Sequence, residues 1–158
     1  MKNYVKILLI GLVAALGFSA CTDDSTSPVD DPSLLNLGAM KATINDSSFY
    51  SQQATCYKLG EQLTISAARY LNNSKSKEII SFTLINPDEG SNTASGYFSY
   101  TPDLNKPSEV TTWPSSNVSV EITLMTATEV LGRFNFVGDS GSDQKRVTNG
   151  TFRVKITG

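Results

Sequence analysis

The feature that most restricts the fold of this chain is a strict alternation of apolar and polar residues. Between Asn117 and Thr126 every second residue is apolar, namely Val118, Val120, Ile122 and Leu124. Successive side chains of a β-strand point to opposite faces, so this period buries one face and leaves the other in water. The same period returns at 63–67, 80–84, 134–136 and 152–156. No segment after the first 20 residues carries a sustained helical stripe, and the pattern therefore predicts an all-β domain.

Turn-forming residues separate the alternating segments. Asn45-Asp46, Asn72-Asn73-Ser74 and Gly138 to Asp143 tolerate tight turns and positive φ. The pattern predicts about eight to ten strands, approximately at 40–45, 48–51, 54–59, 62–70, 78–86, 95–100, 108–113, 117–126, 130–137 and 147–157. This spacing is typical of an antiparallel, meander-rich β-sandwich or flattened barrel.

Two further patterns bear on the strands. Pro102, Pro107 and Pro114 interrupt 101–116, which we expect to be the longest irregular segment. A short echo, Gly-x-Phe, recurs at Gly96, Gly132 and Gly150. Glycine at such a place admits a bulge or a close backbone approach at the start of a strand. The unequal spacing of the three copies favours independent strand chemistry over a true repeat.

The first 20 residues have the organisation of a secretion signal. Lys2 and Lys6 precede the apolar run 7–16, which is too short to span a membrane, and Phe18-Ser19-Ala20-Cys21 follows. This order resembles a bacterial lipoprotein signal, in which the cysteine becomes the acylated N-terminus. We expect residues 1–20 to be removed and Cys21 to be lipidated, and two or three acyl chains would hold the protein on a bilayer. The alternative is an ordinary secretory signal that happens to contain a cysteine.

The sequence predicts a flexible acidic tether at 21–38, ahead of a β-domain at 39–158. It contains Asp23, Asp24, Asp30 and Asp31 and few large apolar residues, so its first part cannot build a core. Thr22, Asp23 and Asp24, directly after Cys21, resemble the surface-export signal of Bacteroidota lipoproteins, and Asp24-Ser25-Thr26 resembles the O-glycosylation pattern of that phylum. A solvated acidic linker is the alternative interpretation of both patterns.

The charges of the β-domain are balanced. The chain has 13 basic and 15 acidic residues; two of the bases lie in the signal and four of the acids in the tether, which leaves 11 of each from Leu34 onward. With no basic block, we expect no binding to nucleic acid and no electrostatic attraction to an anionic membrane.

Catalytic and metal-binding interpretations find little support in the residues. The chain contains no histidine, so Gly138-Asp139-Ser140-Gly141 lacks the base that a serine nucleophile needs, and it predicts a turn instead. Ser74-Lys75-Ser76-Lys77 matches a Ser-x-x-Lys motif but lies in a polar turn between two predicted strands. Once Cys21 is acylated, Cys56 is the single remaining thiol, and we expect it to be buried. We expect no enzyme, no cofactor and no metal site.

Aromatic residues offer a binding surface. Tyr97, Tyr100 and Trp113 flank the proline-rich segment and are candidates for a platform that contacts a sugar or a peptide. In this interpretation Trp113-Pro114 is the most exposed part. The alternative is that these rings close one end of the core.

Both ends of the β-domain resemble one family. Met40-Lys41-Ala42-Thr43-Ile44-Asn45-Asp46 and Val147-Thr148-Asn149-Gly150-Thr151-Phe152-Arg153-Val154-Lys155-Ile156 look like the first and last strands of small Bacteroidota lipoproteins of unknown function. Asp46 stands where that family usually has glycine. The resemblance implies an envelope location and an all-β fold, and no activity. We therefore expect a lipid-anchored outer-membrane protein, facing the cell surface, that binds a glycan or protein ligand. The alternative is a structural lipoprotein, such as an accessory subunit or an inhibitor of an envelope enzyme.

Overall fold

The computed structural model describes residues 31–158. The predicted signal at 1–20, the acylation site Cys21 and the export residues Thr22, Asp23 and Asp24 lie outside the described residues, so these stay predictions. The described part is built from nine strands and two short 3-10 helices: η2 (Pro32–Leu34), β1 (Ala39–Ile44), β2 (Ser47–Ser51), β3 (Ala54–Leu59), β4 (Gln62–Leu71), β5 (Ser76–Ile85), β6 (Gly90–Thr101), η3 (Pro107–Glu109), β7 (Thr111–Met125), β8 (Glu129–Asp139) and β9 (Gln144–Thr157).

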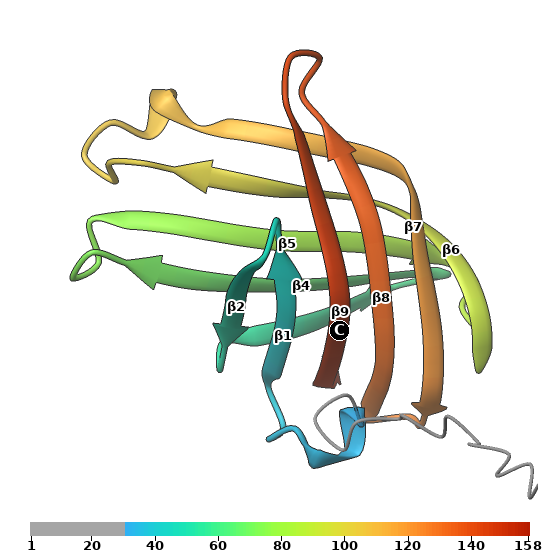
Figure 1. The fold of residues 1–158 in the computed structure, drawn as a ribbon. Helices are drawn as coiled ribbons and strands as arrows, with labels where there is room; N and C mark the ends of the chain where they lie inside the picture. Colours follow the sequence, from blue (N-terminus) through green and yellow to red (C-terminus); the bar gives the residue numbers. More distant parts are fainter. Residues whose placement is uncertain (1–30) are drawn as a thin grey trace, which may run out of the picture.

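Strands β3 to β9 close into a barrel, and the β1–β2 hairpin is added to it (Figure 1). Consecutive strands pair as an antiparallel meander from β3 to β9. One edge of β9 pairs with β8, and two strands share its opposite edge. Residues 147–153 of β9 pair antiparallel with β1, and its last residues pair parallel with β3, where Cys56 lies opposite Ile156. The prediction of an all-β sandwich or flattened barrel with eight to ten strands is confirmed.

One pair of predicted strands is a single strand. The segments expected at 108–113 and 117–126 join in β7, and Pro114 lies inside this strand, opposite Tyr97 of β6. Ladder pairing of β7 with β8 begins only at Ser119, so the proline lies where β7 pairs with β6 alone. A strand with a free edge tolerates a residue without an N–H. The irregular segment is therefore 102–110, shorter than expected.

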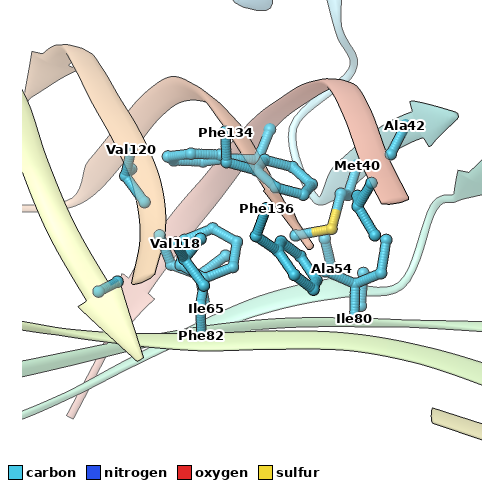
Figure 2. Close-up of a cluster of buried hydrophobic side chains, with 14 of the residues drawn as sticks. Met40, Ala42, Ala54, Ile65, Ile80, Phe82, Val118, Val120, Phe134 and Phe136 are labelled. Atoms are coloured by element: carbon cyan, nitrogen blue, oxygen red, sulfur yellow. The ribbon is translucent and has the colours of Figure 1, made fainter. Parts of the chain in front are cut away.

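Phenylalanine rings fill the middle of the barrel. Phe82 lies 5.0 Å from Phe134 and 5.8 Å from Phe152, measured between ring centroids. Figure 2 shows Phe82 and Phe134 among the aliphatic side chains of the facing strands. All three rings are almost completely buried, so the interior is packed by side chains.

The Gly-x-Phe echo explains how these rings fit. On β8 and β9 the two copies run antiparallel, so that Gly132 lies opposite Phe152 and Gly150 lies opposite Phe134. Gly96 of β6 lies opposite Phe82 of β5 in the same way. The expected close approach is confirmed, because a Cβ at any of the three glycines would come within 2.7 Å of the facing phenylalanine side chain. All three lie inside strands rather than at their start.

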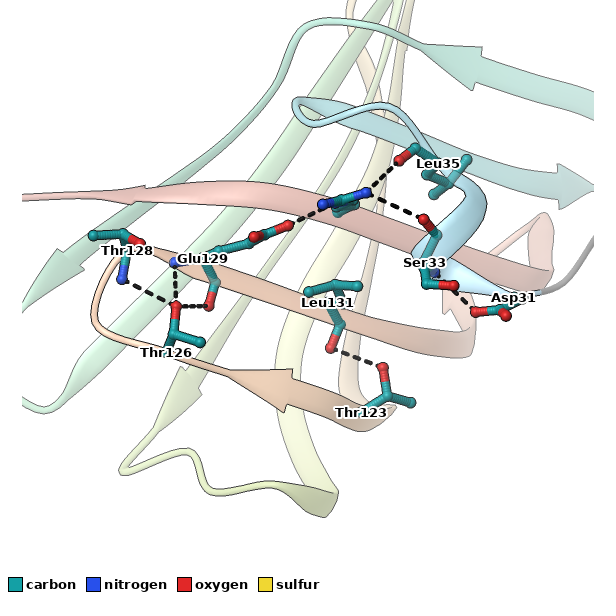
Figure 3. A network of polar contacts seen from close by, with 9 residues as sticks. Asp31, Ser33, Leu35, Thr123, Thr126, Thr128, Glu129 and Leu131 are labelled. Carbon is teal, nitrogen blue, oxygen red and sulfur yellow. Dashed lines mark hydrogen bonds and ion pairs between the residues drawn. The ribbon is translucent and has the colours of Figure 1, made fainter.

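The barrel has two different ends. At the end we call the tether end, the described chain begins at Asp31, and Arg153 ties η2 to the barrel through Glu129 and the carbonyl oxygens of Ser33 and Leu35 (Figure 3). The opposite end, the far end, carries the turns β1–β2, β4–β5, β6–β7 and β8–β9. There the β8–β9 tip diverges from the β4–β5 and β6–β7 tips (Figure 1).

Candidate functional site

Two of the three candidate aromatic residues come together at the far end. Tyr100 of β6 and Trp113 of β7 line one hollow between the diverging tips. Tyr97 is on the same strand as Tyr100, at a position of opposite parity, and its side chain lies on the outer surface with 37% of its area exposed. The three rings therefore do not form one platform.

The expected exposure of Trp113 is wrong. Its side chain is only 6% exposed, because Trp113 lies opposite Phe98 on the inner face and the two rings stack with centroids 5.4 Å apart. Its neighbour Pro114 is exposed. Trp113 and Tyr100 thus close one end of the core, as the alternative interpretation had it, and they do so at the wall of a hollow.

We call this hollow the far-end cup. It has a volume of about 260 Å³ and is lined by Ile44, Glu78, Phe98, Tyr100, Trp113 and Lys145, with the β1–β2 turn at its rim. Its walls are aromatic and aliphatic, with one carboxylate and one ammonium. Ligand sites in proteins combine apolar walls with a few fixed polar groups in this way. The volume suits a single small ring.

Lys145 forms the cationic side of the cup. Its Nζ lies 5.0 Å from the centroid of the Trp113 ring and 2.9 Å from the Asp143 carboxylate. The hydrogen bond from Lys145 lowers the pKa of Asp143 below its usual value. The indole N–H of Trp113 is near enough to Asp143 to contribute a little to this lowering of the pKa. It is buried, however, and forms no hydrogen bond of acceptable geometry. The cup wall therefore contains one buried donor without a partner among the described residues.

Glu78 forms the anionic side and is firmly held. The Arg69 guanidinium bonds the Glu78 carboxylate through two nitrogens, bonds the carbonyl oxygen of Ser48, and lies 5.2 Å from the Phe49 ring centroid. The side chains of Arg69 and Glu78 are 21% and 14% exposed. The guanidinium fixes the position of the Glu78 carboxylate, so Glu78 offers fixed hydrogen-bond acceptors to a ligand.

A second, larger hollow lies on the outside, between β7 and β8. It has a volume of about 550 Å³ and is lined mainly by polar side chains, among them Asn117, Asn135, Asp139 and Arg146. It occurs where the β7–β8 ladder is missing, above the pair Ser119 and Asn135. The Gln144 side chain and the Gly141 N–H lower the pKa of Asp139 by hydrogen bonding to it.

The remaining sequence motifs are structural. Ser140 bonds the Asp143 carbonyl within the β8–β9 turn, so the predicted turn is confirmed for Ser140 and Gly141, whereas Gly138 and Asp139 are the last residues of β8. Ser76 is buried and bonded by Asn72 beside the β4–β5 turn. Cys56 is fully buried, as predicted, and burial raises its pKa to about 11. Among residues 31–158, no group of three or more acidic or cysteine side chains could hold a metal ion.

Sequence reasoning missed Lys145, Glu78 and Arg69. Each lies close to a turn, and none stands in a motif. The strand register places Glu78 opposite Arg69 on β4 and opposite Tyr100 on β6, whereas Lys145 meets Trp113 across strands that do not pair. The one available signal was the position of these charges next to strand ends, which is shared by many solvated residues.

Comparison with known proteins adds no identification. No protein-family model matches the chain, and neither a curated protein nor a solved structure is significantly similar to it. Within residues 31–158, no helix has the length and apolar character needed to cross a membrane.

Proposed function

We propose that this protein is a lipid-anchored envelope lipoprotein that acts as a non-catalytic binding module and takes its ligand in the far-end cup. The observation that carries the proposal is the cup itself, in which Trp113, Tyr100, Lys145 and Glu78 meet at the end of the barrel opposite to Asp31. A chain attached through Cys21 would present this end away from the bilayer.

The spacing between the two ends supports this arrangement. From Lys145, at the cup, to Arg153, beside η2, β9 spans eight residues, or about 26 Å of strand. The first part of the tether adds reach, because the ten residue-to-residue steps from Cys21 to Asp31 extend to at most about 35 Å. An acylated Cys21 would thus leave the cup well clear of the lipid head groups.

The chemistry of the cup favours one sugar unit of a glycan as the ligand. A sugar ring offers apolar C–H faces to Tyr100 and Phe98, and hydroxyl groups at its edge to Lys145 and Glu78. Both charged groups already have protein partners, so a neutral polyhydroxy ligand satisfies the site without leaving a charge uncompensated.

Tryptophan fluorescence tests the cup directly, because Trp113 is the single tryptophan of the chain. Titration with a panel of defined oligosaccharides should give a saturable change in emission for at least one member. Tyr100→Ala should weaken that binding, and Tyr97→Ala is the matched control on the outer face of the same strand. Equal binding by the two variants, or no saturable change with any glycan, would count against the proposal.

Lipidation is tested separately through the thiols. In denaturant, mature protein from the membrane fraction should titrate one thiol per chain, Cys56, because Cys21 would be acylated. An ordinary secretory signal would leave two. Protease shaving of intact cells, with Asp23 and Asp24 replaced by asparagine, tests whether Thr22, Asp23 and Asp24 direct the protein to the cell surface.

A second candidate is a partner-binding lipoprotein, for example an accessory subunit or an inhibitor of an envelope enzyme. The observation that favours it is the outer hollow beside β7, where this strand pairs with β6 alone and offers backbone groups to another chain. Cross-linking through a photoreactive residue at position 117 should then yield one stoichiometric partner, and position 50 on β2 serves as the control.

A further inference from the structure

We propose that the tether end carries a lipid-contacting strip, formed by Leu37, Tyr57, Leu59 and Ile85, that lies against the surface of the bilayer. The inference rests on the proposed attachment through Cys21, and it adds that the barrel is not merely suspended from the tether. It predicts one preferred orientation of the barrel on the membrane.

The exposure of these four side chains sets them apart. Leu37 and Tyr57 are 55% exposed, Ile85 is 59% and Leu59 is 66%. Apart from Leu34 in η2, the other exposed large hydrophobic residues of the described chain have only 37% to 46% of their area in water. Single exposed apolar residues are ordinary on a protein surface. Here the most exposed ones gather at one end.

The strand register places the four side chains on one side of the tether end. Tyr57 and Leu59 are two residues apart on β3 and therefore share the outer face. Leu59 lies opposite Gln62, and Gln62 lies opposite Ile85, so Leu59 and Ile85 are separated by one strand. Tyr57 lies opposite Thr157 of β9, and Thr157 lines a shallow hollow together with Leu37. The four residues thus lie before β1, at the end of β3 and at the end of β5, with polar positions of β9 and β4 between them.

The position of the tether identifies the bilayer as the occupant. Asp31 lies only six residues before Leu37, and ten after Cys21, which limits the separation of Cys21 and Asp31 to about 35 Å. A covalent tether of this length keeps the strip at a high effective concentration near the lipid, so weak apolar contacts suffice to orient the barrel. A second copy of the chain is a poorer occupant, since four side chains fall short of the roughly 800 Å² per partner of a stable interface.

The surrounding charges predict an apolar contact. Lys58 and Lys155 lie at the strip, and Glu61, bonded by Asn86, lies beside it, so the local charge is mixed. Leucine, isoleucine and tyrosine can enter the boundary between head groups and acyl chains, with the tyrosine hydroxyl at the polar level. Contact should therefore depend little on the fraction of anionic lipid.

A depth measurement tests the strip independently of biological acylation. The nine strands of the described residues lie between Ala39 and Thr157, so the chain beginning at Cys21 contains the whole barrel. Its Cys21 thiol can be coupled to a maleimide lipid in vesicles of phosphatidylethanolamine and phosphatidylglycerol, because Cys56 is buried and has a raised pKa of about 11. With Trp113→Phe as background, a reporter tryptophan replaces Leu59 in one variant and Val137, near the far end, in a matched control.

Lipids brominated in the acyl chain should quench the Leu59→Trp emission by at least about twofold relative to the Val137→Trp emission, and changing the anionic fraction should leave the difference intact. Tyr57→Trp provides a second reporter should Leu59→Trp fail to fold. Equal quenching at positions 59 and 137, with coupling confirmed by mass, would overturn the strip. Concentration-dependent association in place of quenching would show that a second copy covers it. Neither result would touch lipidation at Cys21, which the thiol titration decides.

Discussion

Gly150 lies directly opposite Phe134, and the phenylalanine ring fills the space that a side chain at position 150 would need. The relationship is reciprocal, because Gly132 and Phe152 make the same pair two residues away on the same two strands. Each strand therefore supplies one phenylalanine ring, and its glycine leaves the space that the ring of the other strand fills. The Gly-x-Phe spacing is a packing device of the barrel interior.

Alanine at either glycine should destabilise the barrel. A Cβ at Gly150 would come 2.7 Å from the Phe134 ring and collide with backbone as well, and overpacking of this kind costs roughly 1–3 kcal/mol. Urea unfolding followed by circular dichroism measures the loss. Gly60→Asn is the control, since Gly60 has positive φ in an open turn with nothing near it and asparagine accepts that conformation. An unchanged midpoint for Gly150→Ala would contradict the pairing.

Truncation of Trp113 should act mainly on stability. Because its side chain is 6% exposed and stacks on Phe98, we expect Trp113→Ala to cost about 3–5 kcal/mol. Trp113→Phe keeps a ring on Phe98 and should lose markedly less. Thermal melts of the two variants compare them. A Trp113→Ala protein as stable as the natural chain would restore the interpretation of this residue as an exposed platform.

Arg69 and Glu78 should show strong mutual dependence. Removing only the guanidinium in Arg69→Met leaves a mostly buried carboxylate and the Ser48 carbonyl without their partner, which we expect to cost about 2–3 kcal/mol. The double variant Arg69→Met/Glu78→Met should recover part of that loss. A double-mutant cycle from urea unfolding measures the coupling. Additive losses would mean that the pair contributes little beyond its separate contacts.

Cys56 should make the barrel sensitive to alkaline pH. Burial raises its pKa to about 11, while the unfolded thiol ionises near about 8.5. Its contribution to stability is therefore complete below about 8.5 and is lost as the pH rises toward about 11. The free energy of unfolding should fall by about 2–3 kcal/mol across this range. In Cys56→Ala this part of the fall should be missing, and an identical pH profile for the two proteins would refute the assignment.

Much of the fold follows from local patterns, whereas the cup does not. The period of two and the turn residues place most strands, because each strand has one buried face and one wet face. Pro114 misled the prediction because proline breaks a strand only where a ladder needs its N–H, and the sequence does not reveal that β7 has a free edge there. The prediction that Trp113 is exposed failed for a related reason. Trp113 is on the inner face of β7, and this face stays buried up to the far end even where the neighbouring hairpins separate. Glu78 meets Tyr100 across the β5–β6 ladder, whereas Lys145 meets Trp113 although β9 and β7 do not pair, and the period of two does not predict that contact.

Because β9 contacts several other elements, it limits the order in which the barrel can form. This strand contacts β8, β1, β3 and, through Arg153, η2, and it ties Cys56 to Ile156 across 100 positions of the chain. Until β9 arrives, three strands keep an open edge, and contacts so distant in sequence form slowly. The last strand is thus the step on which cooperativity depends. A chain stopped before Gln144 should give no smaller barrel, only a sheet prone to pair with its own copies.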